Sequence, residues 1–207
     1  MFYDILDIKR KEILPALSTF KNEFYLAGGT GLALQLGHRD SIDFDFFTKE
    51  HFDTAKLYER CREVFTGRKI VKVQEEKDTL TVFVDESVKI SFFRYSYPLL
   101  AMLLDEPYLQ IASIADIGCM KLSAIVSRTT EKDYVDLYYI FKHIPLVELM
   151  DKLNDKMPDL DHILVLKSLM YFKDVPDEKI VFKHNCEVAF SKVKEMITNE
   201  ARQVLEF

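Results

Sequence analysis

The sequence predicts an α/β fold of the α+β kind, in which a mixed β-sheet with flanking helices is followed by a helical C-terminal half. Two observations carry this prediction. Strand-like segments are confined to residues 24–112, and three of them follow one another directly before residue 95. From Ser113 onward the apolar residues recur with the helical period instead. We therefore expect an α/β core over residues 1–112 and a helical domain over residues 113–207.

The individual elements follow from spacing and from turn residues. Apolar residues at helical spacing predict helices over residues 5–20, 30–36 and 51–65. Short apolar or alternating runs predict strands over residues 24–26, 41–48, 69–76, 79–85, 88–95 and 108–112. The C-terminal helices are expected over residues 113–127, 131–143, 146–156, 160–171 and 187–205. No flexible linker separates the two halves, so we expect them to pack rigidly.

Composition excludes several classes of protein. The 207 residues include 28 Lys+Arg and 34 Asp+Glu, so the net charge is −6, and any contact with nucleic acid must be local. The three cysteines, Cys61, Cys119 and Cys186, have neither the number nor the spacing of a disulfide framework or a structural zinc site. The N-terminus lacks the apolar run of a signal peptide, and no segment approaches the roughly 20 apolar residues that cross a bilayer. We expect a reduced cytoplasmic protein without a membrane partner.

The first candidate for chemistry is Gly28-Gly29-Thr30, between a predicted strand and a predicted helix. Glycines allow a tight turn and let backbone N–H groups approach a phosphate. The helix N-terminus adds partial positive charge, and Thr30 adds a hydroxyl. An isolated Gly-Gly pair is more often a tight turn with no ligand, so the motif gains weight only from its neighbours.

The second candidate is Asp43-Phe44-Asp45. Carboxylates at i and i+2 of a strand point the same way, about 6–7 Å apart. At an effective dielectric near 20 they repel each other by roughly 2–3 kcal/mol, which a divalent cation between them would relieve. Hard oxygen ligands suit Mg²⁺, which also binds phosphate oxygens. The alternative, and the more common meaning of an arbitrary Asp-x-Asp, is a solvated acidic strand face.

The third candidate is KLSAIVSRTTEKDYVDLYYI, residues 121–140. On one continuous helix Lys121, Arg128 and Lys132 would lie within roughly 20° of one line. Such a row of cations could bind a polyphosphate or face the acidic strand.

The same segment allows a second interpretation. Asp133 and Asp136 lie about one turn apart, beside the row of cations. Thr130-x-x-Asp133 is also a capping-box pattern, which would begin a second helix at residue 130 and make Asp133 its cap. The cations would then share a face only through tertiary packing, and the sequence leaves both interpretations open.

Together these motifs resemble a known family. Residues 24–47, FYLAGGTGLALQLGHRDSIDFDFF, resemble the first signature of the AbiEii/AbiGii toxins, and residues 121–140 resemble the second. Residues 164–175 are similar to members of the family more weakly. These toxins are nucleotidyltransferase-like members of type IV toxin–antitoxin (abortive infection) systems, within the DNA polymerase β-like superfamily. The resemblance implies that residues 1–112 form a nucleotidyltransferase-like core.

The resemblance also implies roles for particular residues and partners. A nucleoside triphosphate would be bound by Gly28, Gly29 and Thr30, with Arg39, Lys121 and Arg128 as further nucleotide-binding residues. Mg²⁺ or Mn²⁺ would be held by Asp43 and Asp45, and the catalytic set would be Asp43, Asp45, Lys132, Asp133 and Asp136. The implied reaction is nucleotide transfer to an acceptor such as tRNA, and the implied protein partner is a cognate antitoxin.

One departure from the family pattern concerns a third carboxylate. Active members of the superfamily present it from a neighbouring strand, expected here at residues 88–93, where the polar-face position is Ser91 and Lys89 lies two residues before. The missing acid favours a degenerate nucleotidyltransferase that binds nucleotide or protein without transfer. The intact Lys-Asp segment favours an enzyme. A third hypothesis, phosphotransfer to a protein, would need Asp133 or Asp136 as the base.

Overall fold

A computed structural model describes residues 1–206, and the mixed α/β fold class is confirmed. Its sheet has the strand order β3-β4-β5-β2-β1-β7-β6. The strands are β1 (Tyr25–Leu26), β2 (Asp43–Thr48), β3 (Ile70–Glu76), β4 (Thr79–Val84), β5 (Val88–Arg94), β6 (Leu104–Asp105) and β7 (Gln110–Ile111). β2 pairs with β5 and β1 with β7 in parallel, and the other pairs are antiparallel.

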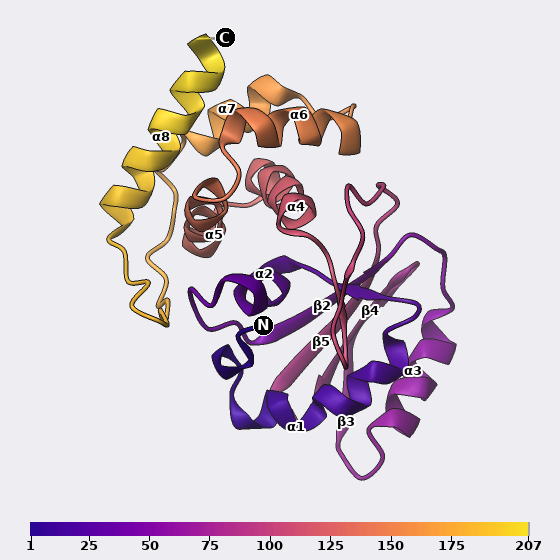
Figure 1. Cartoon of the computed structure of the whole chain (residues 1–207). Coiled ribbons are helices and arrows are strands. Elements are labelled where there is room, and N and C mark those ends of the chain that lie inside the picture. The colour runs from indigo at the N-terminus through magenta and orange to yellow at the C-terminus, as the bar shows by residue number, and fades with distance from the viewer. Residues whose placement is uncertain (207) are drawn as a thin grey trace.

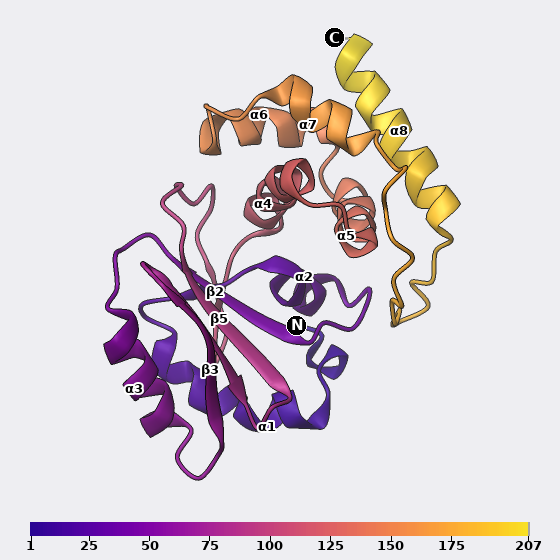
Figure 2. The same cartoon turned by 180° about the vertical axis from the view of Figure 1, so that it is seen from behind.

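The helices lie on both sides of this sheet. They are α1 (Ile8–Leu17), α2 (Gly28–Leu36), α3 (Thr54–Val64), α4 (Ile114–Ser127), α5 (Glu131–Phe141), α6 (Leu146–Lys156), α7 (His162–Leu169) and α8 (Phe190–Glu206), with short 3-10 turns at Tyr3–Ile5 and Ser18–Phe20. Figures 1 and 2 show α1 and α3 on one side of the sheet, with α2 and the C-terminal helices on the other. No helix within residues 1–206 is long and apolar enough to cross a membrane.

Alternation along β2 separates a core face from a polar face, as the sequence predicts. Phe44 and Phe46 are fully buried among the residues that α1 and α3 cover, and the Phe46 ring stacks on Phe92 with centroids 5.4 Å apart. Asp43 and Asp45 occupy the intervening positions, so they point to the opposite face, toward α2 and the helical half. The strand therefore anchors itself with aromatic rings while presenting carboxylates on its other side.

The predicted elements differ from the observed ones mainly at their ends. Helix α2 begins at Gly28, so the two glycines form its first turn and do not precede it. The helix expected over residues 5–20 consists of α1 flanked by the two 3-10 turns. Strand β6 has no predicted counterpart, because two residues carry no periodicity. The sheet ends at Ile111 and α4 begins at Ile114, and we keep a domain division near residue 112 as a proposal.

A buried ion pair fixes the helical half to the loop that follows β5. Lys156 at the end of α6 and Asp116 in the first turn of α4 are both fully buried, with Nζ 2.8 Å from Oδ1. The Lys156 ammonium also donates to the Pro98 carbonyl. Asp116 accepts from the Leu100 N–H at 2.9 Å and from the Ser113 hydroxyl at 2.6 Å. The carboxylate therefore keeps two partners if the lysine is lost, whereas the ammonium keeps one if the carboxylate is lost.

This asymmetry predicts unequal costs of mutation. Asp116→Ala should lower the free energy of unfolding by about 3–5 kcal/mol, because it leaves a buried ammonium without its counter-ion. Lys156→Met should cost clearly less, because the Asp116 carboxylate retains its N–H and hydroxyl donors. Urea unfolding of the two variants measures both values. Equal costs, or a larger cost for Lys156→Met, would contradict this account of the pair.

Candidate active site

The acid pair lies where the sequence places it, at the start of β2. In register across the sheet, Asp43 faces Lys89 and Asp45 faces Ser91 on the parallel strand β5. The Asp43 carboxylate is 41% exposed, and its Oδ2 lies 3.8 Å from Lys89 Nζ. No donor among residues 1–206 hydrogen-bonds the Asp45 carboxylate. The pair is thus a set of oxygen ligands with spare lone pairs.

Electrostatics at Asp45 favour a bound cation. Burial raises the pKa of its carboxyl above the usual value; Lys89 opposes this rise and Asp43 adds to it. Lys121 and Arg128 also lie near enough to oppose it. A partly buried carboxylate without a hydrogen-bond donor gains free energy from a counter-ion, because nothing in the protein fully compensates its charge.

The Gly-Gly turn is built around this carboxylate. Gly28 has φ +63°, in the left-handed region that glycine adopts without strain. A Cβ on Gly28 would lie 3.1 Å from Asp45 Oδ2, so the missing side chain keeps the helix start and the acid close together. Helix α2 has no side-chain cap at Ala27. Its first N–H groups therefore form an uncapped, partly positive helix end beside the acid pair.

Thr30 and Arg39 stabilise this turn through contacts with β2 and with Gly29. Thr30 is buried; its hydroxyl donates to the Asp43 carbonyl and lies 2.7 Å from Ser41 Oγ. That hydroxyl fixes α2 to β2, so the expectation that it would bind phosphate is not supported by its geometry. A Cβ on Gly29 would lie 2.7 Å from Arg39 Nη2, so the second glycine makes room for the guanidinium.

The second motif forms a buried ion network whose centre is Asp136. Its carboxylate, fully buried, accepts from Arg39 Nε and Nη2, each at 2.7 Å. Lys121 Nζ lies 2.6 Å from Oδ2, and His38 Nε2 lies 2.9 Å from Oδ1. Burial by itself would raise the pKa of Asp136, but Arg39, Lys121 and His38 hold it well below the usual value.

Asp133 extends this network toward solvent. It lies 2.6 Å from Lys121 Nζ and 2.8 Å from Arg128 Nε. Burial opposes ionisation of Asp133, but Lys121 and Arg128 keep its pKa below the usual value. The Arg128 side chain is 59% exposed, so it forms the outer end of the network. Three cations and two carboxylates leave one surplus positive charge on the side that faces Asp45.

The interpretation of residues 121–140 as one continuous helix is wrong, and a second helix begins after residue 130 as the alternative predicts. The expectation that Asp133 would cap this helix is wrong, because its carboxylate binds Lys121 and Arg128. Helix α4 ends at Ser127, Arg128 is extended, and the Thr130 hydroxyl caps α5 by accepting from the Asp133 N–H. Lys121 and Arg128 meet at Asp133 through this break, not through helical spacing. Lys132 does not join them: its Nζ lies 3.4 Å from Glu178, and its side chain is 45% exposed.

At the position expected for a third carboxylate, the sheet has uncharged polar side chains: Ser91, Thr81 and Gln74. The predicted pairing of β5 with β2 is confirmed, and it places Ser91 across from Asp45. The Thr81 hydroxyl lies 3.3 Å from Ser91 Oγ and 3.5 Å from Gln74 Oε1. Within residues 1–206 no three His, Cys, Asp or Glu side chains form a metal-binding group. Across from Lys89 and Ser91, strand β2 carries the carboxylates Asp43 and Asp45.

Sequence reasoning missed His38. It is fully buried, its ring packs on Tyr139 with centroids 4.8 Å apart, and its Nδ1 has no partner among residues 1–206. Burial lowers the pKa of His38, against the opposing effect of Asp136, so the ring is neutral at pH 7 and donates from Nε2. The only signal in the sequence is its place beside Arg39.

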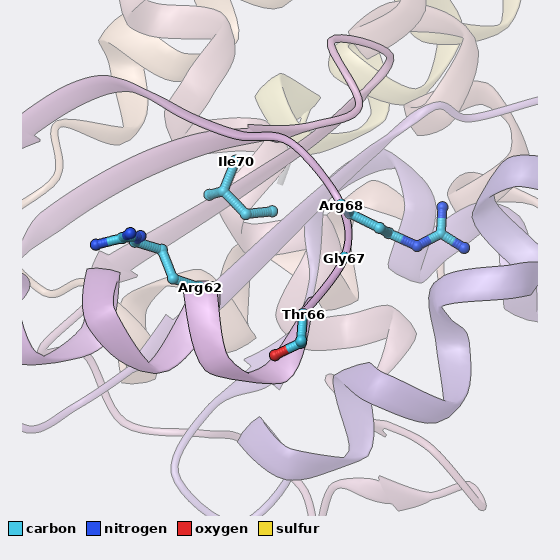
Figure 3. Close-up of a pocket in the computed structure, with 5 residues that line it drawn as sticks. All are labelled: Arg62, Thr66, Gly67, Arg68 and Ile70. Atoms are coloured by element: carbon cyan, nitrogen blue, oxygen red, sulfur yellow. The ribbon is translucent and has the colours of Figure 1, made fainter.

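A surface depression lies at the end of α3, away from the acid pair. Figure 3 shows the side chains of Arg62 and Arg68 directed away from each other. Arg68 pairs with Asp85 at 2.9 Å and Arg62 with Glu59 at 3.1 Å. The other residues that line the depression are Thr66, Gly67 and Ile70. Its cations are already paired and do not converge on a ligand.

The chain is similar in sequence and in overall structure to known proteins. The family model described as nucleotidyl transferase AbiEii toxin, type IV TA system, matches residues 12–184. An uncharacterized protein of Aquifex aeolicus (strain VF5) is 37% identical over 195 residues, 89% of each chain. MenT4, a nucleotidyltransferase toxin of Mycobacterium tuberculosis H37Rv, has a similar structure, with a TM-score of 0.63 and 19% identity over 99% of this chain and 85% of that one. A Helicobacter pylori protein described as a candidate nucleotidyltransferase reaches a TM-score of 0.62 at 18% identity over 97% and 96% of the two chains.

The sheet and its helices have the fold of the nucleotidyltransferase structures named above. The chain belongs to the AbiEii family of nucleotidyl transferase toxins of type IV toxin–antitoxin systems, as the resemblance implied.

The buried network predicts how stability depends on pH. The folded pKa of His38 lies below its unfolded value of about 6.5, so the unfolded chain binds more protons below that pH and folding loses free energy. Asp133 and Asp136 add a second loss, which begins near the unfolded carboxyl pKa of about 3.9 and continues down through their lower folded values. The free energy of unfolding should therefore fall as pH drops below 6.5, by up to about 1.4 kcal/mol per pH unit for one proton.

His38→Gln tests the part of this pH dependence that comes from His38. A glutamine amide can replace the Nε2–H donor but does not titrate. Urea unfolding between pH 5 and 6.5 should give a flatter slope for this variant than for the wild type. An unchanged slope would show that another group causes it.

Proposed function

We propose that this chain binds a nucleoside triphosphate with Mg²⁺ or Mn²⁺ and transfers a nucleotide to a hydroxyl of an acceptor, for which the 3′ end of a tRNA is the leading candidate. One observation carries the proposal. The Asp43 and Asp45 carboxylates lie beneath the uncapped start of α2, with the exposed guanidinium of Arg128 at the edge of the same site. Carboxylates for a metal and donors for phosphates thus converge on one place.

The triphosphate would bind between α2 and the cations. The N–H groups of Gly28 and Gly29 would donate to phosphate oxygens, and Arg128 would donate from the exposed side. Lys121 and Arg39 are buried and paired, so they would supply electrostatic attraction and hold the turn. Lys132 remains a proposed phosphate or acceptor ligand, since its exposed side chain begins one residue from Asp133.

The residues present fit one divalent ion. Asp45 lacks a hydrogen-bond donor among residues 1–206, and the missing Cβ of Gly28 keeps the space beside its Oδ2 open. When bound, the ion would polarise the phosphate and neutralise charge that develops on it. Asp43 and Asp45 would orient the α-phosphate through it, and the helix start would hold the β- and γ-phosphates.

In the proposed reaction an acceptor hydroxyl oxygen bonds to the α-phosphorus. The bond from that phosphorus to the oxygen shared with the β-phosphate breaks, and pyrophosphate leaves with its electron pair. The hydroxyl proton passes to water, because Asp133 and Asp136 are buried, paired and poor bases. The same burial argues against phosphotransfer with either carboxylate as the base.

A second candidate function is supported by Ser91. Without a third carboxylate, the chain could bind nucleotide or a partner without transfer. Incubation with total cellular RNA, Mg²⁺ and each labelled nucleoside triphosphate in turn separates the two functions. Label on RNA supports transfer to RNA, whereas nucleotide binding with no label on RNA or protein supports the binding module. As a type IV toxin in the cytoplasm, active in abortive infection, the chain would be opposed by a cognate antitoxin.

The first prediction here concerns the metal site. Asp43→Asn with Asp45→Asn should remove metal-dependent triphosphate binding, measured by calorimetry, because the strand beside the pair offers Lys89 and Ser91 and no carboxylate at the facing positions. The melting temperature should stay near or above that of the wild type, because neutralisation relieves the mutual repulsion of roughly 2–3 kcal/mol. Glu148→Gln with Asp151→Asn removes the same charge from α6 and should leave binding unchanged. Unchanged affinity in the Asp43/Asp45 variant would rule out the metal site.

The second prediction concerns toxicity. Expression of the wild type should slow bacterial growth. Arg128→Ala should relieve it, because it removes the exposed guanidinium at the edge of the proposed site, and Lys132→Ala should relieve it if Lys132 is the phosphate or acceptor ligand proposed above. Growth curves at matched protein levels measure the effect, with Lys192→Ala on α8 as the control. Variants that fold normally yet arrest growth like the wild type would limit both residues to structural roles. If the wild type does not slow growth in cells that lack an antitoxin, the proposed toxicity is wrong.

A further inference from the structure

Strand β5 carries a lysine, Lys89, two residues before the position where the third carboxylate is expected. The parallel register places Lys89 directly across from Asp43, and Ser91 across from Asp45. The Lys89 ammonium lies 3.8 Å from Asp43 Oδ2, and its side chain is 39% exposed. It reaches Asp43 from β5 and is separate from the cations of the buried network, Arg39, Lys121 and Arg128.

The rest of this side offers nothing that could hold a second divalent ion. Ser91 and Thr81 are buried neutral hydroxyls, and Gln74 continues their row on β3. A hydroxyl is a weak ligand for a divalent ion without a carboxylate beside it. Lys89 is the charged group that β5 directs at the acid pair.

We propose that the Lys89 ammonium occupies the place of the second cation, so that the site holds one divalent ion and one fixed positive charge. This inference rests on the proposed function and specifies its metal requirement. The acid pair carries two negative charges, and Lys89 compensates one of them before any metal binds. The one negative charge that remains on Asp43 and Asp45 can bind a single divalent ion. The ammonium repels a second ion.

Lys89 thereby acts as a positioning residue. It holds Asp43 toward β5 and sets the number of bound ions, and it has no proton-transfer role. A fixed ammonium attracts an acceptor oxygen less strongly than a second divalent ion would, so the acceptor hydroxyl is activated less in this enzyme than in a two-metal one.

Manganese binding tests the proposal without nucleotide or catalysis. Titration of the wild type with Mn²⁺, followed by the electron paramagnetic resonance signal of the free ion, should show one site. Lys89→Met keeps the length of the side chain and removes its charge, so Mn²⁺ should bind about tenfold more tightly. Lys72→Met is the matched control: Lys72 is 36% exposed on β3 of the same sheet but pairs with Glu75, so affinity should not change.

A second variant tests the number of sites. Ser91→Asp combined with Lys89→Met restores a carboxylate and removes the competing ammonium, so it should bind two Mn²⁺ ions. Ser91→Asp alone should bind the second ion more weakly, because Lys89 neutralises the new carboxylate. If either Ser91 variant fails to fold, the single variant Lys89→Met still decides the question.

The outcomes separate this inference from the proposed function. One Mn²⁺ with equal affinity in wild type and Lys89→Met overturns the role of Lys89 and leaves the proposed function standing. Two ions bound by the wild type do the same. A wild type that binds no Mn²⁺ overturns the metal site of the proposed function and this inference together.

Discussion

The structure depends on the burial of one carboxylate, Asp136 on α5. It is ionised and fully enclosed, and its partners come from two other segments, the turn after α2 and helix α4. An uncompensated charge in that position would cost several kcal/mol, so Arg39 and Lys121 must reach it together. The ion pairs of Asp136 therefore fix how the sheet half and the helical half are oriented against each other, in addition to apolar packing.

The position of Asp136 also determines the geometry of the proposed nucleotide site. Because Asp136 fixes the Arg39 guanidinium, and Gly29 leaves room for it, the start of α2 is held against β2. Asp133 likewise fixes Arg128 at the edge of the site. The acid pair needs no such support, because Phe44 and Phe46 lock β2 from the other face. A strand packed by aromatic rings thus carries the proposed metal ligands, and an ion network positions the proposed phosphate ligands.

The sequence predicted those features that depend on interactions between residues close together in the chain. The alternation of β2, the helix breaks and the Thr130 cap depend on residues a few positions apart, and they were found. The pairing of Arg39 with Asp136 spans 97 positions, and its geometry comes only from tertiary packing. For the same reason Lys132 was grouped with cations that it does not join, and His38 was overlooked. The roles of the site residues in catalysis remain predictions.

The ion network also has a consequence for the order in which a ribosome makes this protein. The acid pair and the glycine turn are synthesised before residue 46, but the guanidinium that steadies them has no counter-ion until Asp136 leaves the exit tunnel. The N-terminal part of a nascent chain therefore lacks the complete form of the proposed phosphate site while α4 and α5 are still being made. If that site is needed for toxicity, the chain becomes toxic only late in its synthesis, and a partner protein could meet it before then.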